Sequence, residues 1–183
     1  MILQIYLYGS NVLREKTEPV TPDYPDLKQL IDDMYETMHK AEGIGLAAPQ
    51  IGKAIRLFVI DASPMADEYP EARDFKKVFI NPTIIETSGE PFTYQEGCLS
   101  IPNIREEIVR DSTVKIKYFD ENFNERTDIY YGIVSRVVQH EYDHIEQIVF
   151  TDRLSQLKKK LLKRKLDNIR NGKSMPLYKA RIN

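Results

Sequence analysis

Two histidines four residues apart, His140 and His144, have the types and spacing that point most directly to chemistry in this sequence. They form an H-E-x-x-H pattern in a stretch predicted to be helical. Residues four apart on an α-helix are separated by about 6 Å along the axis and about 40° around it, so both imidazoles can bind one metal ion. Glu141 lies roughly 100° from His140, where it can act as a base on a water at the metal. The alternative is a pair of surface histidines on a solvated helix.

The number of protein ligands distinguishes a catalytic metal site from a structural one. Three protein ligands with one open position are typical of catalytic metal sites, whereas four close the site. Ordinary H-E-x-x-H peptidases take a third ligand further along the chain, but no histidine follows His144 and no glutamate follows Glu146. The single cysteine, Cys98, is therefore the best upstream candidate, because a thiolate is a strong ligand. His39 is better explained as a histidine in the last turn of a helix, where it interacts favourably with the helix dipole. A role as fourth ligand stays open.

Composition limits the class of protein. The 183 residues, 42% of them hydrophobic, predict one domain with a sizeable core. No apolar run reaches the length of about 18 residues that a membrane span needs, and no signal-peptide pattern is visible. One cysteine excludes an intrachain disulfide. We expect a cytoplasmic protein that does not enter a membrane.

Alternating helical and strand patterns must position the candidate ligands. Apolar residues at helical spacing predict a helix from about Asp26 to Glu42, and a second helix carries the histidines from about Ile133 to Gln147. A surface loop is expected over residues 62–77. Strands are expected at 55–61, 78–81, 84–87, 91–94, 113–119 and 127–131, with Pro82 and Gly89 as breaks.

The glycine-containing stretch GIGLAAPQ at 43–50 is not a phosphate loop, because no strand leads into it and no G-K-[ST] follows. Glycines two apart allow another part of the backbone to approach closely. A tight connection between helix and strand and a binding role are both compatible with this pattern.

The C-terminal part of the chain is basic. Residues 152–183 carry 11 Lys or Arg against 2 Asp, a net charge of +9, whereas residues 1–151 carry −11. Leucines at helical spacing between Leu154 and Leu166 predict a basic amphipathic helix, and Leu177 to Ile182 predict a last strand. Such a helix is usually docked by its apolar side; contact with phosphate, more plausibly in RNA than at a membrane, is the alternative.

Three segments together resemble a known family. GIGLAAPQ at 43–50, EGCLS at 96–100 and QHEYDH at 139–144, in this order and at these separations, look like the three motifs of the peptide deformylases. The opening IYLYG at 5–9, followed by VLR at 12–14, is also similar. The resemblance implies an α+β fold in which small antiparallel β-sheets surround a central metal-binding helix, with an additional C-terminal helix. It also implies one catalytic domain over residues 1–183, with a basic extension from about residue 155.

The resemblance implies removal of the formyl group from the N-terminal formyl-methionine of newly synthesised polypeptides. The family's metal ligands fall on Cys98, His140 and His144. Its general acid and base falls on Glu141, which would serve a hydroxide formed at the metal. The Gln50 side chain and the Leu99 backbone N–H would bind the oxyanion.

Substrate contacts are implied as well. The backbone of Gly43, Ile44 and Gly45, with that of Gly97, would hold the peptide as an added strand. The methionine side chain would enter an apolar pocket, and Arg105 would lie near the peptide. The resemblance places four residues in that pocket: Ile44, Tyr94, Ile133 and Val137.

The resemblance also has implications for the metal and the partners. Ligand softness favours zinc, whereas the resemblance implies Fe²⁺, with zinc, nickel or cobalt able to occupy the site. The expected substrates are N-formylmethionyl nascent peptides, and the basic segment Lys158–Lys165 is a candidate for ribosome contact, with no role for DNA. Ile145, Glu146 and Gln147 depart from the family's usual leucine and glycine after the last histidine, which affects how the helix end packs.

Two rival functions use the same residues. One is a metallopeptidase that cleaves internal peptide bonds with Cys98 as third ligand. The other is a ribosome-associated protein without activity, in which His39 closes a structural Cys-His-His-His site.

Overall fold

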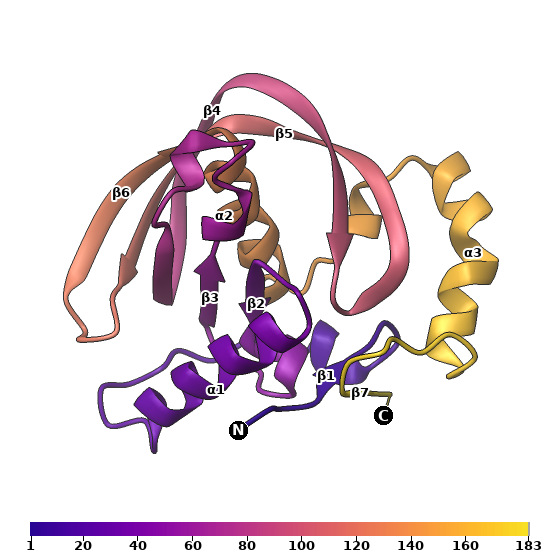
Figure 1. Ribbon diagram of the computed structural model, residues 1–183, viewed down its shortest axis with the longest axis horizontal. Coiled ribbons are helices and arrows are strands. Elements are labelled where there is room, and N and C mark those ends of the chain that lie inside the picture. The colour runs from indigo at the N-terminus through magenta and orange to yellow at the C-terminus, as the bar shows by residue number, and fades with distance from the viewer. Residues whose placement is uncertain (183) are drawn as a thin grey trace.

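The structure is a computed structural model that describes residues 1–182 (Figure 1). Over these residues the α-helices are α1 (Leu27–Lys40), α2 (Gly132–Ile145) and α3 (Gln156–Arg170). The strands are β1 (Ile5–Tyr6), β2 (Gly45–Ala47), β3 (Leu57–Asp61), β4 (Lys76–Cys98), β5 (Ile101–Phe119), β6 (Glu125–Tyr131) and β7 (Ala180–Arg181). Short 3₁₀ turns lie between them, including Ala48–Ile51 after β2.

Strands β2 to β6 form an antiparallel sheet in the order β2-β3-β4-β5-β6. The long hairpin β4–β5 crosses the molecule from this sheet to the turn beside β1 and α3 (Figure 1). The expectation of separate strands between residues 78 and 94 is wrong, because β4 is continuous there. Pro82 and Gly89 lie at shifts of register, between Ile80 and Thr83 and between Ser88 and Pro91, so they bend the strand without ending it.

The expected α+β fold around a central helix is confirmed. α2 packs one face against the sheet, where Ile133, Val137 and Val138 join a buried cluster with Phe58 and Phe79. The helix starts beside the loop after β3, because the backbone N–H of Ile133 donates to Glu71 Oε1 at 3.1 Å. A carboxylate at a helix N-terminus is favourable for the helix dipole. The loop therefore helps to position α2, which carries His140 and His144.

A second sheet joins the two ends of the described chain. β1 and β7 pair in parallel, which differs from the antiparallel pairing expected for the small sheets. The last strand is predicted correctly in place, although it is only two residues long. Parallel pairing arises because the chain returns through α3 before it reaches β1 (Figure 1).

Helix α3 is docked by its apolar side. Leu162, Leu166 and Ile169 are buried in the cluster that also holds β1 and α1, and Lys and Arg side chains cover the outer face. Leu157 and Leu161, which share the predicted apolar pattern, are 68% and 72% exposed instead. Among the described residues, no helix is long and apolar enough to cross a membrane.

Candidate functional site

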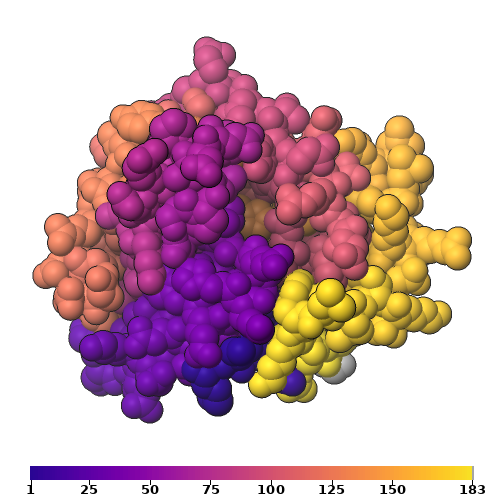
Figure 2. Space-filling view, viewed as in Figure 1, coloured from indigo at the N-terminus to yellow at the C-terminus, as the bar shows by residue number. Residues whose placement is uncertain are grey.

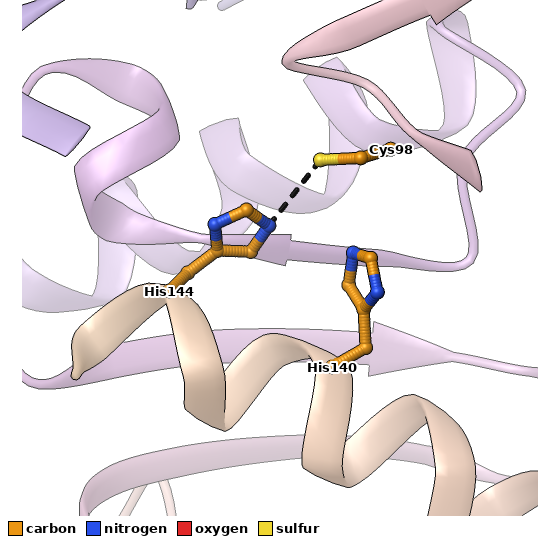
Figure 3. A group of neighbouring side chains, drawn as sticks. All are labelled: Cys98, His140 and His144. Atoms are coloured by element: carbon orange, nitrogen blue, oxygen red, sulfur yellow. Dashed lines mark hydrogen bonds between the residues drawn. The ribbon is translucent and has the colours of Figure 1, made fainter. Parts of the chain in front are cut away.

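Three ligand side chains converge at the centre of the molecule. Cys98 ends β4, while His140 and His144 lie one turn apart on α2, and the sulfur points toward both rings (Figure 3). Cys98 Sγ lies 3.3 Å from His144 Nε2, and one ligand atom from each residue lies within 4.8 Å of the others. Two such ligands on one tetrahedral metal are separated by about 3.5 Å. The donor set and its spacing therefore fit a single metal ion.

Glu96 orients the first histidine. Its Oε2 lies 2.9 Å from His140 Nδ1, which leaves Nε2 as the nitrogen that faces the sulfur side of the site. A carboxylate behind a metal-binding histidine fixes both the tautomer and the ring orientation. Burial alone would raise the pKa of Glu96, but hydrogen bonds from His140 and Arg110 hold this pKa far below its usual range. The lowered pKa favours the ionised form of Glu96 at neutral pH.

Glu96 belongs to a buried network of charges. Arg110 donates to it from Nε at 2.6 Å and from Nη2 at 3.0 Å, and Arg136 donates from Nη1 at 2.6 Å. Arg110 also reaches Asp143 at 2.8 Å, and Asp143 accepts from Arg153 at 2.7 Å. The three residues nearest the site, Glu96, Arg110 and Arg136, expose 4% or less of their side chains. This network joins β4, β5 and α2 around the candidate metal site.

Glu141 lies on the same helix turn as His140 and is 4% exposed. Its Oε2 is buried without a hydrogen-bond partner in the described part of the chain. Burial raises the pKa of Glu141 to about 7, where a carboxyl group can both accept and release a proton near neutral pH. A side chain on Gly45 would lie 2.6 Å from the Glu141 carboxyl carbon, so the close approach of β2 requires glycine there.

Gln50 and Leu99 flank the sulfur. Gln50 is 1% exposed, and its Oε1 accepts from the Ala47 N–H at 2.8 Å. This bond turns its amide nitrogen to Ser100 Oγ at 3.2 Å and to Cys98 Sγ at 3.5 Å. Leu99 follows Cys98 in the tight turn between β4 and β5. Both are placed beside the candidate metal site.

A cleft of about 1270 Å³ opens over these groups. Figure 2 shows it as a hollow between the purple N-terminal part and the pink β4–β5 hairpin. Cys98, His140 and Glu141 line it, with Gln50 and Leu99, whereas His144 is buried behind them. All the residues predicted to contact substrate line the same cleft: Gly43, Ile44, Gly45, Tyr94, Gly97, Arg105, Ile133 and Val137.

His39 does not belong to the ligand group. Its Nε2 lies 2.9 Å from Asp61 Oδ2, and its side chain is 45% exposed. Within residues 1–182, the potential ligands that lie close enough together to share one metal ion are Cys98, His140 and His144. The rival structural site with His39 as fourth ligand is therefore wrong.

The sequence analysis predicted no role for Glu96, Arg110 or Arg136, although Glu96 lies in the EGCLS segment. A signal was present for Arg136, which precedes His140 by four residues and therefore shares its helix face. Glu96 stands two residues before Cys98, and side chains two apart on a strand point to the same face. Nothing local identifies Arg110, because β5 brings it to Glu96 from 14 residues away.

Comparison with known families gives one match over most of the chain. A family model described as polypeptide deformylase matches residues 2–160. A peptide deformylase of Christiangramia forsetii is 52% identical, over all of this chain and 96% of that protein. A peptide deformylase of Flavobacterium johnsoniae is 49% identical, again over all of this chain and 96% of the relative.

Solved structures agree with the sequence comparisons. The crystal structure of a peptide deformylase from Legionella pneumophila aligns with a TM-score of 0.81 at 35% identity, covering 96% of this chain and all of that one. The peptide deformylase of Thermotoga maritima aligns with a TM-score of 0.76 at 37% identity, covering 85% of this chain and 99% of that one.

The role of Glu96 can be tested by Glu96→Gln. This variant removes the anion behind His140 and leaves Arg110 and Arg136 undercompensated. We expect metal affinity, measured with Co²⁺ in competition with a chelator, to fall about 10-fold to 100-fold. The free energy of unfolding of the metal-free protein in urea should fall by about 3 kcal/mol.

Glu106→Gln is the matched control, since Glu106 is also a glutamate of the β4–β5 hairpin. It pairs with Lys158 at 3.2 Å, where the two side chains are 24% and 39% exposed. We expect a loss of less than about 1 kcal/mol and unchanged metal affinity. Equal metal affinities of wild type and Glu96→Gln would show that His140 needs no orienting carboxylate.

Proposed function

This chain belongs to the polypeptide deformylase family, and from this membership we propose that it is a metal-dependent hydrolase that removes the formyl group from the N-terminal formyl-methionine of newly synthesised polypeptides. The observation that carries the proposal is the convergence of Cys98, His140 and His144 beside the buried Glu141 in one open cleft. A metal-dependent hydrolase needs metal ligands, a base beside them and a cleft through which substrate reaches them.

Fe²⁺ is the metal we propose, held by the Cys98 thiolate and two imidazoles, with zinc, nickel or cobalt able to replace it. When bound, the metal supplies a Lewis acid and makes a water acidic enough to attack at neutral pH. Three protein ligands are the number typical of catalytic metal sites, and the cleft that Cys98 and His140 line would give water and substrate access to the ion. Ligand softness alone would favour zinc, so the choice of iron depends on the family.

Glu141 moves the protons of the reaction. Its unpartnered Oε2 would accept a proton from the attacking water and pass it to the amine that leaves. The raised pKa suits both halves of this task, because the group must gain and lose one proton in each turnover. Gly45 allows β2 to lie directly against the carboxylate, because any larger side chain there would clash with it.

Gln50 and Leu99 would stabilise the negative charge that develops on the formyl oxygen. Gln50 presents its amide N–H groups because Ala47 fixes its other end. The Leu99 backbone N–H would be the second donor. Losing one donor of this kind typically costs about 3 kcal/mol in the activation barrier.

The nascent peptide would bind as an additional strand. β2 is one of the two edge strands of the five-stranded sheet, and Gly97 lies in β4 on the other wall of the cleft. Backbone pairing with both walls would hold any peptide regardless of its side chains, which suits an enzyme with many substrates. Ile44, Tyr94, Ile133 and Val137 would surround the methionine side chain, with Arg105 further along the peptide.

Beyond the cleft we propose a ribosome contact for α3. Its exposed cations are well placed to meet phosphates, since the apolar side is already docked on the core. We further propose that residues 1–183 act as one catalytic domain with a basic extension from about residue 155. A cytoplasmic location would bring this enzyme to its formylated substrates.

Glu141→Gln should abolish turnover while metal remains bound. We expect formate release from a formyl-Met peptide, measured anaerobically with iron supplied, to fall about a thousandfold. Co²⁺ affinity should stay near that of wild type. Glu146→Gln is the control, because Glu146 follows α2 directly and pairs with Arg56 at 2.7 Å. Retained activity in Glu141→Gln would remove the acid and base role from this residue.

The same assay distinguishes a deformylase from the rival metallopeptidase that cleaves internal peptide bonds. A deformylase releases formate from the formylated peptide and leaves an acetylated or unblocked peptide of the same sequence intact. Cleavage of internal bonds in the unblocked peptide would contradict the proposal.

Ile133→Ala should weaken the preference for methionine. The substitution enlarges the pocket, so the ratio of kcat/KM for formyl-Met over formyl-Ala peptides should fall about tenfold. Val134→Ala, a neighbouring buried position of α2 in the sheet-facing core, should reduce stability and leave the ratio unchanged. An unchanged ratio in Ile133→Ala would exclude this side chain from the pocket.

Replacing the exposed Lys160, Lys163, Arg164 and Lys165 by Gln tests the ribosome contact. We expect weaker co-sedimentation with ribosomes and a shallower dependence on salt, because fewer phosphate contacts release fewer counterions. Formate release from a short peptide should be unchanged. Ribosome binding by wild type that is insensitive to salt would contradict an electrostatic contact.

A further inference from the structure

The segment after α3 returns to the centre of the molecule. Lys179 and Arg181 carbonyls accept hydrogen bonds from the backbone N–H groups of Ile5 at 3.0 Å and Leu7 at 2.9 Å. In Figure 2 the yellow C-terminal residues lie directly beside the purple and pink walls of the hollow. This segment lies outside residues 2–160, the part that matches the family model. It nevertheless reaches the active-site turn.

Tyr178 makes that contact. Its hydroxyl donates to the Leu99 carbonyl at 2.5 Å, and the ring packs against the buried cluster around β1. Burial raises the pKa of Tyr178, and the nearby Cys98 raises it further. The hydroxyl therefore keeps its proton and acts as a donor to the carbonyl.

The carbonyl that accepts this hydrogen bond belongs to the peptide unit whose N–H donates to the Cys98 sulfur. The Leu99 C=O and the Ser100 N–H are the two ends of one planar group. The Ser100 N–H donates to Cys98 Sγ at 3.4 Å. A hydrogen bond to the carbonyl polarises the group and strengthens the bond that its N–H makes. Tyr178 is thus connected to the candidate metal ligand through a single peptide unit.

Other contacts hold the rest of the turn but act on different groups. The Tyr8 N–H donates to the Ser100 carbonyl at 2.8 Å, and Gln50 Nε2 donates to Ser100 Oγ at 3.2 Å. The Leu99 carbonyl is held by Tyr178. This carbonyl and the Leu99 N–H lie in adjacent peptide units joined at the Leu99 Cα, so holding the carbonyl restricts the backbone torsions that set the direction of that N–H.

We propose that Tyr178 is a positioning residue of the active site, which through the Leu99–Ser100 peptide unit strengthens the hydrogen bond to the Cys98 sulfur and orients the Leu99 N–H. The second part rests on the proposed role of Leu99 in deformylation. The first part concerns the thiolate alone and needs no substrate. The basic C-terminal extension therefore contributes to the chemistry of the catalytic centre.

A hydrogen bond to a thiolate lowers the energy of its lone pairs. In the Co²⁺-loaded protein, loss of this bond should move the sulfur-to-metal charge-transfer absorption to longer wavelength. Outer contacts of this kind also keep a ligand in its binding orientation, and losing one typically lowers metal affinity about tenfold or more. These readouts report on the sulfur without any turnover.

Tyr178→Phe removes only the hydroxyl and is the decisive variant. We expect the Co²⁺ charge-transfer band to shift to longer wavelength, Co²⁺ affinity to fall about tenfold, and kcat for a formyl-Met peptide to fall about tenfold with KM unchanged. The Tm of the metal-free protein should stay within a few degrees of wild type, because the ring remains packed.

Arg181→Gln is the matched control. Arg181 lies in β7, three residues after Tyr178, with its guanidinium 5.1 Å from the centre of the Tyr6 ring, and its replacement leaves the Tyr178 hydroxyl in place. We expect its spectrum, Co²⁺ affinity and kcat to equal those of wild type. The same changes in Arg181→Gln as in Tyr178→Phe would overturn the proposal, because strand docking alone would then explain them.

A second variant keeps the test independent of any packing defect. Tyr178 replaced by a ring-fluorinated tyrosine retains the hydroxyl and makes it a stronger donor, so the band should move to shorter wavelength. A wild-type spectrum in both Tyr178 variants would overturn the proposal even if wild type releases formate. A shifted spectrum in a protein that releases no formate would support the thiolate contact and contradict the proposed function.

Discussion

The buried carboxylate of Glu96 is the interaction on which the rest of the site depends. It accepts hydrogen bonds from Arg110 on β5 and from Arg136 and His140 on α2. One anion therefore ties the long hairpin to α2 and orients the ring of His140. The second anion of the network, Asp143, is bound by Arg110 and Arg153, so both carboxylates of this network face opposite charge.

Such a network specifies geometry more than it stabilises the fold. Taking several charges out of water is costly, and their mutual attraction repays this cost only when hydrogen bonds are well formed. Stability comes instead from the apolar clusters on the sheet side of α2 and around β1, α1 and α3. The arrangement allows α2 to carry buried polar residues on one face, because its other face is anchored in the core.

The sequence alone indicated the family, three candidate metal ligands and the order of the helices. The family follows from three motifs in their order, and the spacing of His140 and His144 is a local property of a helix. Cys98 was the best third candidate because the chain has no other cysteine, no histidine after His144 and no glutamate after Glu146. These features can be recognised along the chain, so they need no tertiary information. The comparisons confirmed the family, and the geometry agreed with the three ligands.

Tertiary structure decided what lies behind those ligands. Glu96 meets Arg110 across a hairpin, and Tyr178 reaches Leu99 from 79 residues away. His39 pairs with Asp61 and lies outside the candidate metal site. β4 also continues through Pro82 and Gly89, where local propensity predicted interruptions, because pairing with β5 resumes after each irregularity. The sequence specifies such contacts only through the whole folded chain, since each joins residues that no short-range pattern connects.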